Sequence, residues 1–211
     1  MDETGGVDRV VALSDGVFAI ALTLLALPLV DADIREDFVG GDVLGLGPKL
    51  LVFALSFAVI GRYWRVHHQA FIHIVRADGT LVGLNLLFLF WIALLPFPTA
   101  VLGEHGDTTA GVVLYASTII LTGLSSTGLW WYAAVGRARL RADTRPLTHE
   151  DTDPEWVRRG LAGGIAVVVG FVPSLPLAFV DPLLAELSWL LVPPVGHLLD
   201  RLSRRQRYFW P

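Results

Sequence analysis

Four polar residues lie within or at the edge of stretches that are otherwise apolar. Ser14 and Asp15 interrupt the first of these stretches, residues 8–30, while His67 follows the end of the second and Asn85 lies inside the charge-free third. If the stretches cross a membrane, an ionisable carboxylate or an unpaired amide is costly at that depth, and each must find a polar partner on a neighbouring helix. The sequence therefore predicts an interhelical polar cluster that pairs Asp15 with His67 and Asn85.

The same residues allow other chemistries. Asp15 and His67 could form a proton relay, and Asp15 alone could bind an ion. The spacings of one, five and six residues among His67, His68 and His73 do not give the i, i+4 pair of a helical zinc motif. The sequence also has no cysteine, no Gly-x-Ser-x-Gly elbow and no phosphate-binding glycine loop. We therefore predict no metal site, no cofactor and no enzyme.

A second pattern runs along the first stretch. At roughly 100° per residue, Ser14 and Asp15 project away from a stripe that is apolar except for one hydroxyl. The stripe consists of Leu13, Gly16, Ile20, Thr23, Leu24 and Leu27. Periodicity alone favours helix packing or lipid contact for this stripe, and the Thr23 hydroxyl could bond back to a carbonyl of its own helix. The position of Asp15 off the stripe favours a structural role for its carboxylate.

The composition excludes an ordinary soluble domain. Hydrophobic residues make up 54% and charged residues 17% of the chain, and the mean hydropathy is +0.59. The net charge of −4 gives no reason to expect a nucleic-acid partner. We predict an all-α, polytopic membrane protein, a single unit of six transmembrane helices embedded in the lipid bilayer. The expected spans are 8–30, 44–66, 79–102, 108–135, 158–180 and 183–200.

The last two spans follow a different kind of segment. Residues 137–159 are polar and basic, and we expect them to form a cytosolic linker between a four-helix part and a two-helix part. The fifth span opens with small residues, among them Gly160 and Gly164, which permit close helix packing. Pro173 and Pro176 should kink its far half.

The distribution of positive charge predicts the orientation. Of the 16 Lys and Arg residues, Arg35 and Lys49 lie in or at the edge of the first loop, and all others lie near the termini and in the second and fourth loops. By the positive-inside rule, both termini and the even-numbered loops are cytoplasmic. The N-terminus has no basic region or cleavage site of a signal peptide. We therefore expect a multi-pass protein of the cell membrane that retains its first helix.

Several short motifs together resemble the transmembrane protein 175 family of potassium channels. The first-helix signature of that family, Arg-x-x-x-Phe-Ser-Asp, is matched here with leucine in place of phenylalanine. The matching positions are Arg9-x-x-x-Leu13-Ser14-Asp15, then Ile20, Thr23 and Leu27-Pro28, then Trp64-x-x-His67 with Phe71, and finally Asp78…Asn85 with Leu95-Pro96-Phe97. The length of the chain resembles the single six-helix unit of the prokaryotic members.

The resemblance implies a homotetramer in which the first helices line a central pore. It places Ile20, Leu24 and Leu27 at a bulky pore constriction, and gives Thr23 a part in cation preference. Like that family, the sequence lacks the Thr-Val-Gly-Tyr-Gly filter of ordinary potassium channels. Potassium would then be preferred because a narrow apolar constriction demands partial dehydration, which costs the more strongly hydrated sodium more. Potassium and other monovalent cations are the expected permeant ions.

The resemblance also gives the polar residues a structural role. It implies that His67 helps to hold the Ser14-Asp15 motif in place, and it is compatible with Arg9 as a further partner of Asp15 at the cytoplasmic end. Asn85 completes the expected cluster.

Two other classes of protein remain as alternatives. A proton- or cation-coupled secondary transporter would use Asp15 and His67 as a relay. Against it stand the lack of a detectable inverted repeat and a first helix that we expect to be uninterrupted, because transporter sites usually use broken helices. A membrane-embedded enzyme would depend on His67 for turnover. We rank both below the channel.

Overall fold

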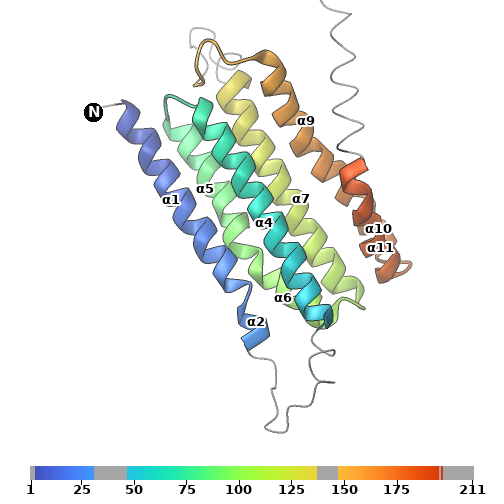
Figure 1. The fold of residues 1–211 in the computed structure, drawn as a ribbon. Helices are drawn as coiled ribbons and strands as arrows, with labels where there is room; N and C mark the ends of the chain where they lie inside the picture. The colour runs from blue at the N-terminus through green and yellow to red at the C-terminus, as the bar shows by residue number, and fades with distance from the viewer. Residues whose placement is uncertain (1–2, 31–46, 137–146, 195, 197–211) are drawn as a thin grey trace, which may run out of the picture.

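The computed structural model describes residues 3–30, 47–136, 147–194 and 196, and these residues form a bundle of helices (Figure 1). Within these ranges the chain forms no strand, and its one β-bridge joins Ile74 to Thr148. The predicted all-α class is therefore confirmed. The helices are α1 (Glu3–Leu24), α2 (Leu27–Val30), α4 (Gly47–His73), α5 (Gly79–Leu94), α6 (Pro96–His105), α7 (Thr109–Trp131), the π-helical segment η1 (Tyr132–Gly136), α9 (Pro154–Phe171), α10 (Ser174–Leu177), α11 (Pro182–Ser188) and the 3₁₀ turn η2 (Trp189–Leu191).

Five of the described helical segments are long and apolar enough to cross a membrane. They are Gly6–Leu29, Lys49–His73, Gly79–His105, Thr109–Gly136 and Pro154–Leu177. These five overlap the first five expected spans, and the second runs to His73 rather than to residue 66. The predicted sixth span, 183–200, is described only in its first part, which contains α11 and η2, and 195 and 197–200 lie outside the described residues. The single six-helix unit therefore stays a prediction.

Proline residues divide three of these segments into two helices each. Pro96 begins α6 directly after α5. Pro173 lies between α9 and α10, where the sequence predicted a kink. The expectation of an uninterrupted first helix is wrong, because α1 ends at Leu24 and α2 begins at Leu27. The physical reason is Pro28, which has no N–H to donate to the carbonyl one turn earlier and whose ring crowds that carbonyl.

α7 is the central helix of the bundle. It packs against α5 and α6 on one side and α9 on the other, and α1 packs against α4 and α5 (Figure 1). Small residues set the distance between α7 and α9. A Cβ atom at Gly164 would come within 2.1 Å of Thr127 Oγ1, and one at Gly160 would come within 2.7 Å of Trp130 Nε1. The predicted close packing of the fifth span is therefore present.

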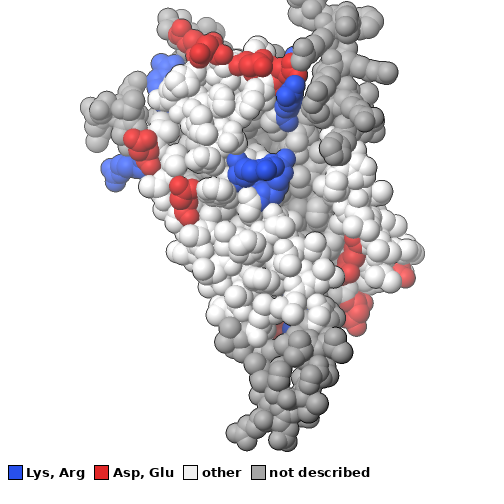
Figure 2. Space-filling model, viewed as in Figure 1, with Lys and Arg blue, Asp and Glu red and all other residues white. Residues whose placement is uncertain are grey.

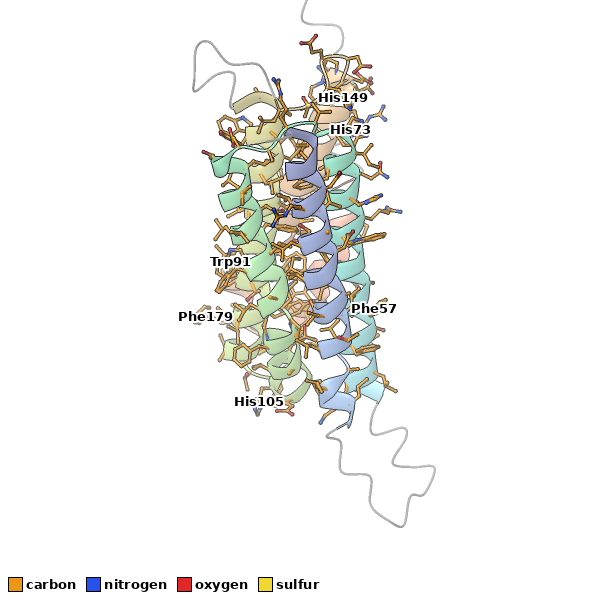
Figure 3. The ribbon with its side chains drawn as sticks, turned by 90° about the vertical axis from the view of Figure 1, so that its left-hand side faces the viewer. Phe57, His73, Trp91, His105, His149 and Phe179 are labelled. Carbon is orange, nitrogen blue, oxygen red and sulfur yellow. The ribbon has the colours of Figure 1, made fainter. Side chains whose placement is uncertain are left out.

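The end of the predicted linker is attached to the bundle. Val75 N donates to Leu147 O at 2.9 Å, and His149 N donates to His73 O at 3.0 Å. Figure 3 shows His73 and His149 at the same end of the bundle, with His105 at the opposite end. The His73 ring also stacks on Trp156 of α9 at 3.8 Å between ring centroids. The start of α9 is thus joined to the end of α4.

Candidate functional site

The first helix has two faces of different character. Its buried face carries Ser14, Phe18, Ala21 and Leu25, which pack against the bundle. The opposite face carries large apolar side chains that remain exposed in the single subunit. These include Leu13, Ile20, Leu24 and Leu27, and the exposed fraction of Ile20 is 61%. An apolar stripe of this kind is covered by lipid or by another protein surface in the assembled molecule.

A chain of hydrogen bonds attaches the buried face of α1 to α5 and α4. His67 Nε2 donates to Asn85 Oδ1 at 2.8 Å, and Asn85 Nδ2 donates to Ser14 Oγ at 3.1 Å. Ser14 Oγ donates in turn to Val10 O of its own helix at 2.8 Å. Ser14, His67 and Asn85 are at most 4% exposed. The predicted partner for the Asn85 amide is therefore found, and three helices meet at this cluster.

Aromatic rings enclose the His67 side chain. The imidazole stacks on Phe71 with ring centroids 4.4 Å apart and on Phe88 at 5.5 Å, and Phe18 lies at 5.7 Å with a tilted ring. These contacts fix the orientation of the imidazole and leave Nε2 directed at Asn85. We refer to Ser14, His67 and Asn85 as the polar cluster.

The prediction that Asp15 pairs with His67 and Asn85 is wrong. Asp15 is exposed, and its Oδ1 accepts a hydrogen bond from Trp64 Nε1 at 2.9 Å. Consecutive residues of a helix point roughly 100° apart, so Ser14 faces the bundle interior and Asp15 faces its surface. The Trp64 ring stacks on His68, with centroids 5.4 Å apart. Asp15 thus forms a second, peripheral attachment of α1 to α4.

Arg9 is also exposed, and in the described part of the chain no ion pair joins it to Asp15. Six residues along a helix correspond to roughly 120° around its axis and about 9 Å along it. This separation explains why the expected pairing of the two side chains does not form.

The predicted pore-lining residues all lie on the exposed face. Ile20, Leu24 and Leu27 project from the bundle, as does Thr23. The Thr23 hydroxyl donates to the Ile20 carbonyl at 2.8 Å, which is the intrahelical bond considered above as the alternative to a pore role. The pore roles of these four residues stay predictions.

Sequence reasoning missed a second buried group of hydroxyls. The Thr99 hydroxyl donates to Leu95 O of the preceding turn at 2.9 Å and lies 3.1 Å from Ser56 Oγ, which lies 3.3 Å from the Tyr115 hydroxyl. These side chains join α4, α6 and α7 close to the break between α5 and α6. No local pattern identifies them, because single hydroxyls in apolar helices more often bond back to their own backbone.

The described residues contain no group of three His, Asp or Glu side chains placed to hold a metal ion. The three neighbouring histidines point at different partners, since His67 contacts Phe71, His68 contacts Trp64 and His73 contacts Trp156.

These features define a polytopic α-helical membrane protein whose first helix is anchored by a buried cluster and presents an apolar outer face. The sequence profile of the family described as Endosomal/lysosomal potassium channel TMEM175 matches residues 9–96. This range includes all of the polar cluster and all of the exposed stripe. Over these residues the chain is similar to the TMEM175 family.

Individual relatives agree with this similarity. A potassium channel of Streptomyces collinus is 40% identical over 139 residues, covering 63% of this chain and 65% of that relative. The endosomal/lysosomal proton channel TMEM175 of Mus musculus is 40% identical over 98 residues, covering 42% of this chain and 20% of the mouse protein. The match therefore spans just under two thirds of the bacterial relative's length.

A solved structure extends the likeness over nearly the whole chain. The crystal structure of a lysosomal potassium-selective channel TMEM175 homolog from Chamaesiphon minutus superposes with a TM-score of 0.67 at 27% identity. The superposition covers 93% of this chain and 99% of that chain.

Proposed function

We propose that the protein is a potassium-preferring cation channel, in which the first helix of each subunit lines a central pore. The observation that carries the proposal is the exposed apolar stripe of α1, which lies opposite the face held by the polar cluster. A helix anchored on one side and apolar on the other is suited to line a narrow constriction. The channel names of the bacterial relatives favour the same activity over an enzyme.

The proposed assembly is a homotetramer in the cell membrane with both termini in the cytoplasm. Four copies around one axis would bring four Ile20, four Leu24 and four Leu27 side chains into successive rings. The distribution of basic residues supports the orientation, since Arg9 and Arg158 lie near the starts of α1 and α9 and Arg76 follows the end of α4. Figure 1 shows these helix ends at the end of the bundle that holds the N-terminus.

Selectivity in this proposal comes from the rings themselves. An ion that passes a narrow apolar ring must shed part of its hydration shell, and this penalty is larger for sodium than for potassium. No cofactor is required, and potassium is the permeant ion. A small rotation of the four α1 helices would widen or close the rings, and a closed ring excludes water as well as ions.

The proposal is tested by the reversal potential of the purified protein in a planar bilayer under a potassium/sodium gradient. The wild type should give a reversal potential directed toward the potassium equilibrium value. Ile20→Asn should move it toward zero, because an amide ring supplies polar oxygens that help sodium to dehydrate.

Ile165→Asn is the matched control, since Ile165 is likewise exposed but lies on α9. It should leave the reversal potential unchanged. Equal potentials in the wild type and Ile20→Asn would contradict the first-helix pore. A pH gradient in the same bilayer measures proton permeation, which the name of the mouse relative makes worth separating from potassium flux.

One observation favours a coupled transporter as the second candidate. The first span is broken between Leu24 and Leu27, and transporter sites are often built at breaks of this kind. The relay that we considered is weakened, because Asp15 bonds to Trp64 and His67 bonds to Asn85. Saturable, stoichiometrically coupled uptake into liposomes, without bilayer currents, would favour the transporter.

A further inference from the structure

A long groove is lined mainly by residues of α4, α7 and α9. Figure 1 shows how these three helices are arranged in the bundle. The volume of the groove is about 1030 Å³. The lining residues that carry the argument are Leu55, Val59, Arg62, Arg65, Gly163 and Phe171. The groove is separate from the exposed stripe of α1, and the proposed channel activity makes no use of it.

The groove is cationic at one end and apolar along the rest. α4 carries no charged residue from Leu50 to Gly61 and then presents Arg62 and Arg65. α9 runs in the opposite direction and is uncharged beyond Arg159. In Figure 2, basic side chains gather in the middle of this face, above a broad surface of uncharged residues.

Nearby tryptophans indicate that the basic end of the groove lies at the level of the lipid headgroups. Trp64, Trp130 and Trp156 lie toward the same end, and tryptophan is enriched at the level of lipid headgroups. Arg62 and Arg65 are exposed, and neither forms an ion pair with an acidic side chain of the described residues. Two adjacent guanidinium groups without a carboxylate partner attract an anion at this level.

We propose that this groove binds an anionic phospholipid, with its phosphate against Arg62 and Arg65 and one acyl chain along the apolar part. The two ends of the groove match the two parts of such a lipid in charge and polarity. Basic pockets between transmembrane helices on the cytoplasmic side are suited to anionic headgroups. The inference does not depend on the proposed channel activity.

The far C-terminal part of the chain is the first competing occupant, because Val192 and Pro193 line one end of the groove. The sequence that follows Gly196 carries four arginines and a single acid, Asp200. This C-terminal sequence therefore has a net positive charge, which Arg62 and Arg65 repel. A second copy of the chain is the other competitor.

Charge is tested by native mass spectrometry of the full-length protein in detergent, titrated with phosphatidylglycerol or with phosphatidylcholine of the same acyl chains. Phosphatidylglycerol should bind more tightly. Arg62→Gln with Arg65→Gln should weaken its binding by about fivefold for each arginine removed, and phosphatidylcholine binding should hardly change. Arg158→Gln is the control, because Arg158 lies at the same end outside the groove.

Space is tested separately from charge. A Cβ atom at Gly163 would meet no other atom within 4 Å, so Gly163→Leu fits the protein but fills the groove. It should reduce binding of phosphatidylglycerol while both arginines remain. Gly128 also has open space around it but does not line the groove, so Gly128→Leu should leave lipid binding unchanged.

Three results would overturn the proposal. The first is equal affinity for the two lipids, and the second is an equal effect of Arg62→Gln and Arg158→Gln. The third is occupation of the groove by a protein segment. Introduced cysteines can detect it by forming a disulfide, because the chain has no cysteine of its own to compete. A bond between Val59→Cys and Leu199→Cys in one chain would place the C-terminal part there, and a dimer formed by Val59→Cys alone would place a second copy there.

Discussion

Two adjacent residues of α1 attach the helix to α4 in opposite ways. Ser14 is fully buried and joins a continuous path of hydrogen bonds through Asn85 to His67. Asp15 is exposed and makes one bond to the edge of the Trp64 ring. We expect burial to decide the stabilising free energy of a polar contact more than charge does, because a buried group that loses its partner has no water to replace it.

The largest effect should come from Asn85→Leu. The substitution leaves the buried His67 Nε2–H without an acceptor and Ser14 Oγ without its donor. We expect the free energy of unfolding to fall by about 2 kcal/mol. Reversible unfolding in mixed micelles measures it. Leu86→Ala is the control because Leu86 is an exposed neighbour on α5, and equal losses from the two variants would contradict the importance of the cluster.

A double-mutant cycle with Ser14→Ala and Asn85→Ala isolates the bond between these two side chains. The coupling free energy should be about 0.6 kcal/mol, which is typical of hydrogen bonds between helices in a membrane. The same unfolding assay supplies all four free energies. Simple additivity of the two substitutions would mean that the path through Asn85 contributes no pairwise stabilisation.

A smaller effect should come from Trp64→Phe, which removes the donor to Asp15 but keeps a ring to stack on His68. We expect a change in unfolding free energy below about 0.5 kcal/mol. Asp15→Asn should be smaller still, since an amide oxygen can accept the same bond. A loss as large as that of Asn85→Leu would show that the assembled protein buries this surface pair.

The sequence predicted the buried cluster in part. The need of the Asn85 amide for a partner on another helix followed from its apolar surroundings, and the structure confirms it. The prediction placed Asp15 wrongly for a physical reason. The free-energy cost of a polar side chain in the membrane identifies residues that need partners, but it does not say which face of the helix they occupy. Helical rotation separates Ser14 from Asp15, and only the packing of α1 shows which of the two faces inward.

The sequence predicted only some of the helix breaks and none of the contacts among the second group of hydroxyls. Pro173 was expected to kink its helix, and α9 ends just before it, whereas the break before Pro28 was overlooked. The contacts among Ser56, Thr99 and Tyr115 join residues far apart in the chain. Nothing in the local sequence distinguishes them from hydroxyls that bond to their own helix.

The break at Leu25 and Ala26 has a mechanical consequence. Ile20 stands on the same rigid rod as the polar cluster, so a torque applied to Ser14 through Asn85 turns Ile20 with it. Leu27 stands beyond the break, on the four-residue helix α2. Ile20 and Leu27 therefore stand on separate helical segments. A rotation of α1 that moves Ile20 need not move Leu27 by the same amount.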